Sequence, residues 1–177
     1  MHGKFPAALA LALAVGSSAL AADDTADSSQ YLNRIESVVF EATGDHQAIA
    51  KRGATCIAQI AKPGLVNAPI IVSSDFDAGV IVANNNFKFS IHGFLGVALE
   101  ETGRTTLTLQ AKDGRFRIVH TSIEQFIEYP GSSIPSQGWS PVYTAAPNAS
   151  DFKTTVDEIS QKIADCVKAD PSKDSNW

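Results

Sequence analysis

The side chains best suited to acid–base chemistry are three histidines, His46, His92 and His120, and two carboxylates, Asp75 and Asp77. None of the three histidines has a second ligand at the short spacings typical of zinc sites, so no metal is expected. Asp75 and Asp77 resemble the start of a calcium loop, but the later ligands are missing. The sequence contains no Gly-x-Ser-x-Gly elbow and no phosphate-binding loop. It therefore predicts no catalytic residues and no cofactor.

Two hypotheses about activity follow from these residues. A small hydrolase could use a diffuse site formed by His92, Asp75 and Asp77. The lack of a catalytic signature favours a non-enzymatic binding or interaction module instead, with a protein or a small ligand as its partner.

The only two cysteines, Cys56 and Cys166, are too far apart in sequence for a CxxC redox or metal motif. Each lies on the apolar stripe of a predicted helix, over residues 45–60 and 150–168. If the two helices lie side by side, the cysteines can form a disulfide, as is usual in oxidising compartments. The alternative is a pair of buried, reduced thiols.

Residues 1–21 have the organisation of a secretory signal peptide. Lys4 precedes an apolar run of about a dozen residues, which is short for a membrane-spanning helix of roughly 20. The run is followed by Ala19-Leu20-Ala21, a small-x-small cleavage pattern. We expect cleavage after about Ala21 and a periplasmic or secreted protein without a membrane anchor.

The composition fits one domain. The chain has 177 residues, 44% of them hydrophobic, and a formal net charge of -5. This acidic balance argues against nucleic acid as a partner. We expect a flexible leader over residues 22–33, a single domain over 34–169 and a frayed end over 170–177.

The residue patterns predict an α+β fold: an antiparallel sheet of about five strands with two helices packed on one face. The expected order is β-α-β-β-β-β-α. Strands are predicted over residues 34–42, 69–76, 79–90, 105–112 and 115–126, with the helices over 45–60 and 150–168. The run Asn84-Asn85-Asn86 is expected to mark a bulge or an irregular stretch in its strand.

The hairpin around Asp113-Gly114 has a predictable register, because this dipeptide favours a two-residue turn. Lys112 then pairs with Arg115, and alternate residues of both strands share an apolar face toward the helices. The opposite face is polar and is a candidate contact surface for a ligand, a partner or a second copy in a homodimer. Its residues are Thr106, Thr108, Gln110, Arg117, Val119 and Thr121.

A Pro/Gly/Ser-rich loop over residues 129–148 holds Trp139 and Tyr143. Aromatic side chains on such a loop are either a contact point for a partner or pack back on the core. Both interpretations are open at the level of sequence.

Two segments carry a family resemblance. Asp75-Phe76-Asp77-Ala78-Gly79-Val80-Ile81 and Lys112-Asp113-Gly114-Arg115-Phe116-Arg117 resemble turns of the domain-of-unknown-function family 4468, over roughly residues 36–128. The resemblance implies a TATA-binding-protein-like fold and an exported bacterial protein. That family has no assigned activity, so the resemblance implies no site residues, and a fold shared with a DNA-binding protein does not transfer DNA binding.

Overall fold

The computed structural model describes residues 30–63, 69–92, 98–127 and 138–169. For residues 91, 92, 98 and 99 it describes the backbone. The expected signal peptide, residues 22–29 of the leader, the first part of the 129–148 loop and the expected frayed end lie outside the described residues.

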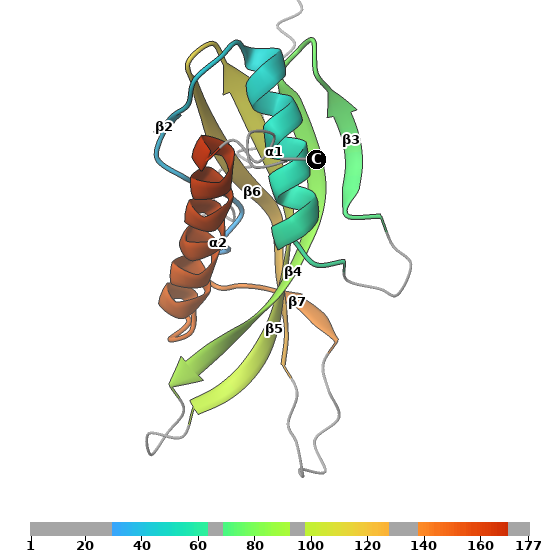
Figure 1. Cartoon of the computed structure of the whole chain (residues 1–177). Coiled ribbons are helices and arrows are strands. Elements are labelled where there is room, and N and C mark those ends of the chain that lie inside the picture. The colour runs from blue at the N-terminus through green and yellow to red at the C-terminus, as the bar shows by residue number, and fades with distance from the viewer. Residues whose placement is uncertain (1–29, 64–68, 93–97, 128–137, 170–177) are drawn as a thin grey trace, which may run out of the picture.

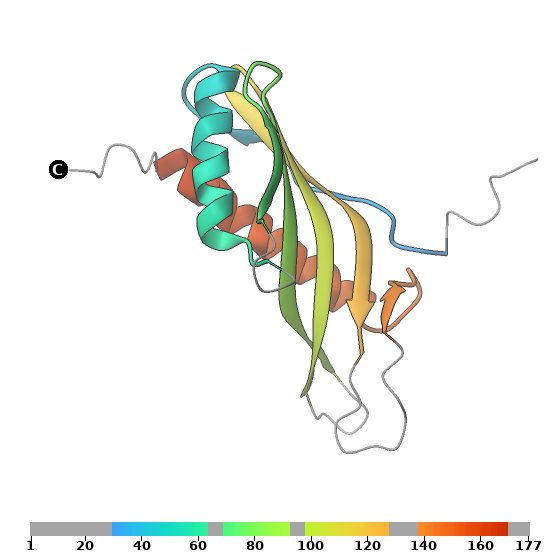
Figure 2. The same cartoon turned by 90° about the vertical axis from the view of Figure 1, so that its right-hand side faces the viewer.

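The described chain is an α+β fold in which both helices lie on one side of an antiparallel sheet (Figures 1 and 2). The sheet has seven strands, in the order β1-β6-β5-β4-β3, with β2 and β7 also paired to β6. The elements are β1 (Ile35–Glu36), β2 (Phe40–Glu41), α1 (His46–Ile60), β3 (Ile71–Asp75), β4 (Val80–His92), β5 (Ala98–Lys112), β6 (Arg115–Phe126), β7 (Trp139–Pro141) and α2 (Ala149–Ala169). The predicted fold class is confirmed, whereas the strand number is seven instead of about five.

The difference in strand number arises at the outer edge of β6. The segment expected as one strand over 34–42 forms two short strands, β1 and β2, separated by the stretch of residues 37–39. Val38 and Val39, which suggested a continuous strand, lie in that stretch and are 72% and 59% exposed. β7 pairs with the far end of β6 and was not predicted. Strands of two or three residues are too short to show an alternating pattern.

The register predicted for the β5–β6 hairpin is confirmed. Lys112 pairs with Arg115, Leu107 with His120, and Thr108 with Val119. Gly114 has a φ of +75°, which glycine adopts without steric cost.

The irregularities in the sheet differ from those expected. β4 runs without a bulge through Asn84-Asn85-Asn86, all of which pair with β5. The register shifts lie instead between Ile71 and Ser73 and between Arg104 and Thr106. The three asparagines therefore leave the strand regular.

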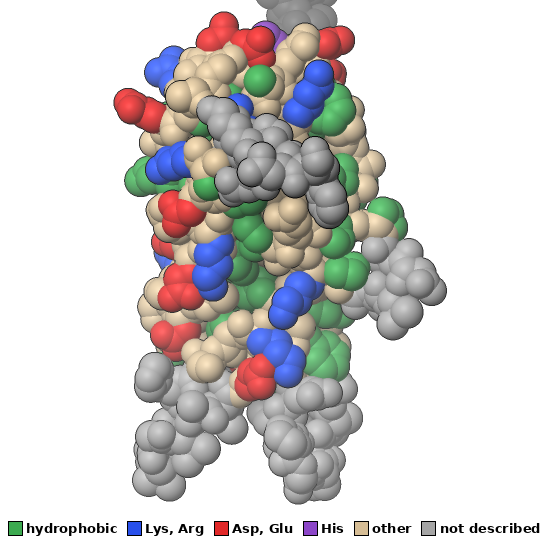
Figure 3. All heavy atoms as spheres, viewed as in Figure 1, with side chains coloured by type: hydrophobic (Ala, Val, Ile, Leu, Met, Phe, Trp, Pro, Cys, Tyr) green, Lys and Arg blue, Asp and Glu red, His purple; other side chains and the backbone are tan. Residues whose placement is uncertain are grey.

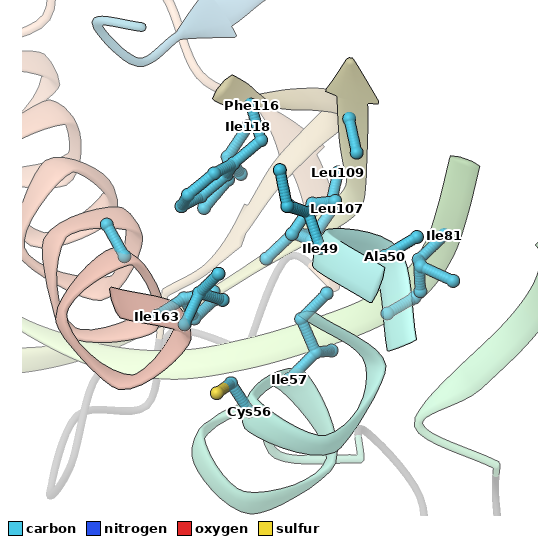
Figure 4. Close-up of a cluster of buried hydrophobic side chains, with 14 of the residues drawn as sticks. Ile49, Ala50, Cys56, Ile57, Ile81, Leu107, Leu109, Phe116, Ile118 and Ile163 are labelled. Carbon is cyan, nitrogen blue, oxygen red and sulfur yellow. The ribbon is translucent and has the colours of Figure 1, made fainter. Parts of the chain in front are cut away.

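The core lies between the sheet and the two helices (Figure 4). α1 contributes Ile49 and Ile57, and the sheet contributes Leu107 and Leu109, all of them fully buried. Gly53 allows close packing, since a Cβ at this position would lie 2.6 Å from Leu109 Cδ1. A second cluster of aromatic side chains packs beneath the first half of α2, formed by Phe87, Phe89 and Phe152.

The expected disulfide joins the two helices. Cys56 of α1 and Cys166 of α2 are bonded, with their Cα atoms 5.8 Å apart. α1 begins as expected after Asp45, whose carboxylate accepts a hydrogen bond of 2.7 Å from the Ala48 amide. The prediction that the helices lie side by side is confirmed.

The domain begins before residue 34. Leu32 is buried, and its amide donates a 2.7 Å hydrogen bond to the Val142 carbonyl. Tyr31 forms a bridge with Tyr143. Residues 30–33 were expected in a flexible leader. They are held to the domain by the buried Leu32, and a single apolar residue in a polar segment gives no pattern that would predict this.

Candidate binding surfaces

The open sheet face carries all six residues of the predicted contact surface. They alternate with core residues along β5 and β6, so their side chains point away from the helices. Five of them are partly exposed: Thr106, Thr108, Gln110, Arg117 and Thr121. Val119 is only 2% exposed, so it contributes almost no accessible surface to this face.

The polar side chains at one margin of the open sheet face bind one another. Glu36 accepts hydrogen bonds from Arg34 and from Arg117, the latter at 3.1 Å. Arg117 Nε also donates to Gln110 Oε1 at 2.9 Å. These contacts hold the Arg117 guanidinium against the sheet, so its position is set before any partner arrives.

A hollow of about 470 Å³ lies beside this network, toward the two hairpin turns. Its walls include Val39 from the stretch between β1 and β2, Val80 from β4, and Arg117 from β6. Val39 is accessible to solvent, which places an apolar side chain at the rim of a polar surface.

Trp139 packs on the sheet, in agreement with one of the two interpretations of its loop. Its ring centroid lies 5.6 Å from that of Phe126, and the Arg104 guanidinium lies 4.2 Å above it. Arg104 is further held by Glu124 at 2.7 Å. Trp139 is therefore part of the fold at one end of the open sheet face.

Tyr143 is the more accessible of the two aromatic residues, at 50% exposed. Its ring lies 4.8 Å from that of Tyr31. The neighbouring Val142 is fully buried, so this end of the loop is anchored in the core.

The structure separates the residues of the hydrolase hypothesis. Asp75 and Asp77 lie at the turn that begins β4, and His92 lies at the other end of this 13-residue strand. At about 3.3 Å per residue, the two ends are roughly 40 Å apart. They therefore form no common site. Asp75 and Asp77 have structural contacts instead. Asp75 accepts a hydrogen bond from the Ala78 amide, and Asp77 accepts one from the Gln47 side chain.

His120 is a core histidine, as its position on the inward face indicates. Its two ring nitrogens lie 3.0 Å from Thr105 Oγ1 and 3.0 Å from Ser160 Oγ. Burial lowers the pKa of His120 to about 4, so the ring is neutral at physiological pH. The Ser160–His120 contact has the spacing of a catalytic pair, but both side chains are buried, at 2% and 0% exposed, and would not be accessible to a substrate.

His46 fastens the hairpin turn to the start of α1. Its amide and its Nδ1 contact Asp113 Oδ1 at 2.9 and 2.8 Å. This hydrogen bond raises the pKa of His46 and lowers the pKa of Asp113. Both groups lie at the surface of the turn.

A buried polar cluster lies beneath the start of α2. Asn148 Nδ2 donates to Glu101 at 3.1 Å and to Gln125 at 2.8 Å. Burial raises the pKa of Glu101, while the hydrogen bond from Asn148 opposes this shift. No three potential ligands among His, Cys, Asp and Glu come together as a metal site in the described ranges.

A second recess lies on the helix side and was not foreseen from the sequence. We define the β4 groove as the hollow of about 480 Å³ between the later part of β4 and the first half of α2. Its floor and walls include Asn85, Phe89, Ile159, Lys62, Lys88 and Lys162. The asparagine run was the only sequence signal for it, because Asn85 occupies an inward position in an otherwise apolar alternation.

The fold and these surfaces define an α+β protein with a one-sided helix layer and no recognisable catalytic centre among its described residues. No helix of the described segments is long and apolar enough to span a membrane. No family model and no curated protein matches the chain.

Solved structures share the fold. A DUF4468 family protein from Bacteroides ovatus superposes with a TM-score of 0.55 at 14% identity, over 76% of this chain and 85% of its own. A TBP-like protein from Parabacteroides distasonis superposes with a TM-score of 0.56 at 8% identity, over 76% of this chain and 91% of its own. The fold suggested by the sequence resemblance is therefore confirmed.

Proposed function

We propose that this chain is an exported interaction module that binds another protein through its open sheet face. Export is supported by the signal-peptide pattern of residues 1–21 and by the Cys56–Cys166 disulfide, since such bonds persist mainly in oxidising compartments. The periplasm is the expected compartment, with secretion as the alternative destination.

The observation that carries the proposal is the one-sided coverage of the sheet (Figure 2). Antiparallel sheets can leave one face to solvent, and such a face is usually strongly polar. Here the face also presents Val39 and Val80 around a hollow, beside the fixed guanidinium of Arg117. Arginine is enriched in protein contact surfaces, and an accessible apolar side chain beside it would lose its contact with water when a partner covers it.

The charge of the molecule restricts the partner. The formal net charge of -5 opposes polyanions in general, whereas a protein surface with an apolar patch and a carboxylate would match Val39 and Arg117. A second copy of the chain is one such partner. A homodimer through the open sheet face would bring two acidic molecules together, so its formation should be favoured by salt.

Light scattering after size-exclusion chromatography tests the homodimer, with the change Val39→Asp and its neighbour Val38→Asp as the matched control. Both valines are accessible, but only Val39 lines the hollow. We expect V39D to shift a concentration-dependent dimer toward monomer, while V38D leaves it unchanged. A strict monomer at millimolar concentration, in low and high salt, rejects the second copy as the partner.

A further inference from the structure

The β4 groove lies beside an unpaired sheet edge. β3 pairs with β4 only as far as Ala83, and the next two edge positions are bonded by loop carbonyls. The Asn84 amide donates to the Ile70 carbonyl at 2.8 Å, and the Asn86 amide to the Lys62 carbonyl at 3.0 Å. Because edge positions alternate along a strand, the amides of Lys88 and Ser90 point to the same side. The described part of the chain supplies no partner for either amide.

Asn85 adds a second unmet hydrogen-bonding group in the same place. Its side chain is 2% exposed and lines the β4 groove, and no described residue supplies a hydrogen-bond partner for its Nδ2. A buried amide nitrogen without an acceptor destabilises the fold, because it has lost its hydrogen bonds to water and gained none in return. An oxygen atom delivered into the groove would remove that destabilisation.

Three basic and two acidic described side chains line the groove. Lys62 and Lys162 line it from the end of α1 and from α2, and neither forms an ion pair with another described residue. Lys88 is paired with Glu100 at 2.9 Å. The acidic residues of the lining, Asp151 and Glu158, belong to α2. Figure 3 shows hydrophobic side chains at the bottom of this recess with basic side chains on either side of it.

We propose that the β4 groove binds an extended acidic peptide, which adds to the free edge of β4 as a further strand. The peptide backbone would pair with Lys88 and Ser90, as in other cases of strand addition. One of its oxygen atoms would accept from Asn85 Nδ2. Its acidic side chain would lie between Lys62 and Lys162, and its apolar side chains would cover Phe89 and Ile159.

This site is separate from the hollow beside Arg117, because the two share no lining residue. Each surface can therefore be tested without altering the other.

Selection from a random octapeptide library on the immobilised full-length mature protein tests the proposal. We expect enrichment of peptides with Asp or Glu flanked by β-branched residues. The double change Lys62→Glu and Lys162→Glu should weaken an enriched peptide by roughly tenfold, as reversal of two surface charges predicts. Lys153→Glu is the matched control, since Lys153 is also on α2 but does not line the groove.

N-methylation of the enriched peptide, one residue at a time, tests strand addition separately. Methylation at alternate residues should abolish binding, because only every second peptide amide faces β4. Failure to enrich acidic peptides, equal weakening by the Lys153→Glu control, or N-methylation without an alternating effect would each overturn the proposal.

Discussion

The buried side chains of the inward sheet face show how this protein accommodates polar groups in its core. His120 is bonded on both ring nitrogens, by Thr105 from β5 and Ser160 from α2. A neutral imidazole can donate at one nitrogen and accept at the other, so both hydroxyl contacts can be satisfied together. This arrangement ties α2 to the sheet through a polar contact that depends on the ring being uncharged.

Acidification should therefore weaken the fold through His120. Its folded pKa of about 4 lies below the ordinary histidine value of 6.5, so the unfolded chain binds the proton first as the pH falls. The contribution is complete above pH 6.5 and is lost toward pH 4, by about 2–3 kcal/mol at pH 4.5. Urea unfolding at pH 7.5 and 4.5 measures this loss. We expect a much smaller pH dependence in His120→Gln, whereas His46→Gln should retain the loss; an equal loss in H120Q would show that other groups cause it.

Gly103 lies where two aromatic rings leave no room for a side chain. A Cβ at this position would lie 2.6 Å from Phe87 Cε2 and 2.8 Å from Phe152 Cε2, both in packed aromatic rings. We predict that Gly103→Ala lowers the free energy of unfolding by about 1–3 kcal/mol, the usual cost of overpacking. Adding Phe87→Leu should recover part of the loss, and a double-mutant cycle by thermal or urea denaturation measures this coupling. Additive effects of the two changes would contradict the steric explanation.

At the scale of elements, the disulfide is the covalent link in the helix layer. The bond closes a loop with a sequence separation of 110 residues between Cys56 and Cys166. We expect reduction to lower the free energy of unfolding by about 2–4 kcal/mol, mainly by relaxing a constraint on the unfolded chain. Urea denaturation with and without reductant measures this difference. A thiol assay on the denatured, non-reduced protein should find no titratable cysteine, and two free thiols would contradict the bond.

The end of the 129–148 loop is a structural element of the sheet. β7 pairs with β6, Trp139 packs against Phe126, and Val142 is buried. Deleting residues 132–143 should therefore lower the melting temperature by at least several degrees, as the loss of a buried valine and a strand pair requires. Differential scanning calorimetry measures the change. A melting temperature that stays within one degree would mean that this segment contributes nothing to the fold.

The sequence revealed the larger elements because their signals are local. The Asp113-Gly114 turn and the alternation on either side of it determine the register of β5 and β6. The apolar stripes of the two helices place Cys56 and Cys166 near each other. The short strands β1, β2 and β7 give no comparable signal, because their pairing depends on the distant edge of β6.

The candidate surfaces were predictable only in part, for a related reason. Alternation along β5 and β6 identifies the residues that point outward, but it does not show that Val119 is nearly inaccessible or that Val39 lies beside them. The residues of the hydrolase hypothesis do not meet, because β4 separates His92 from Asp75 and Asp77, and the strand predicted over 79–90 already placed most of that length between them. The β4 groove depends on where β3 ends and on where α2 crosses, which are properties of tertiary packing.

At the scale of the whole molecule, the helices and the disulfide form one layer and leave the opposite sheet face available (Figure 2). On that face, hydrogen bonds hold Arg117 in position and Val39 is exposed. These two features are the basis of the proposed protein contact.

The most direct test of that contact is photo-crosslinking in the cells that naturally make the protein, with benzoylphenylalanine in place of Val39 or, as the control, Val38. The two positions are adjacent and both are accessible, but only position 39 borders the hollow on the open sheet face. The account predicts a discrete crosslinked protein from position 39, either a second copy or another chain, and little or none from position 38. Equal crosslinking from the two positions, or no adduct from position 39, would contradict the open sheet face as the binding surface.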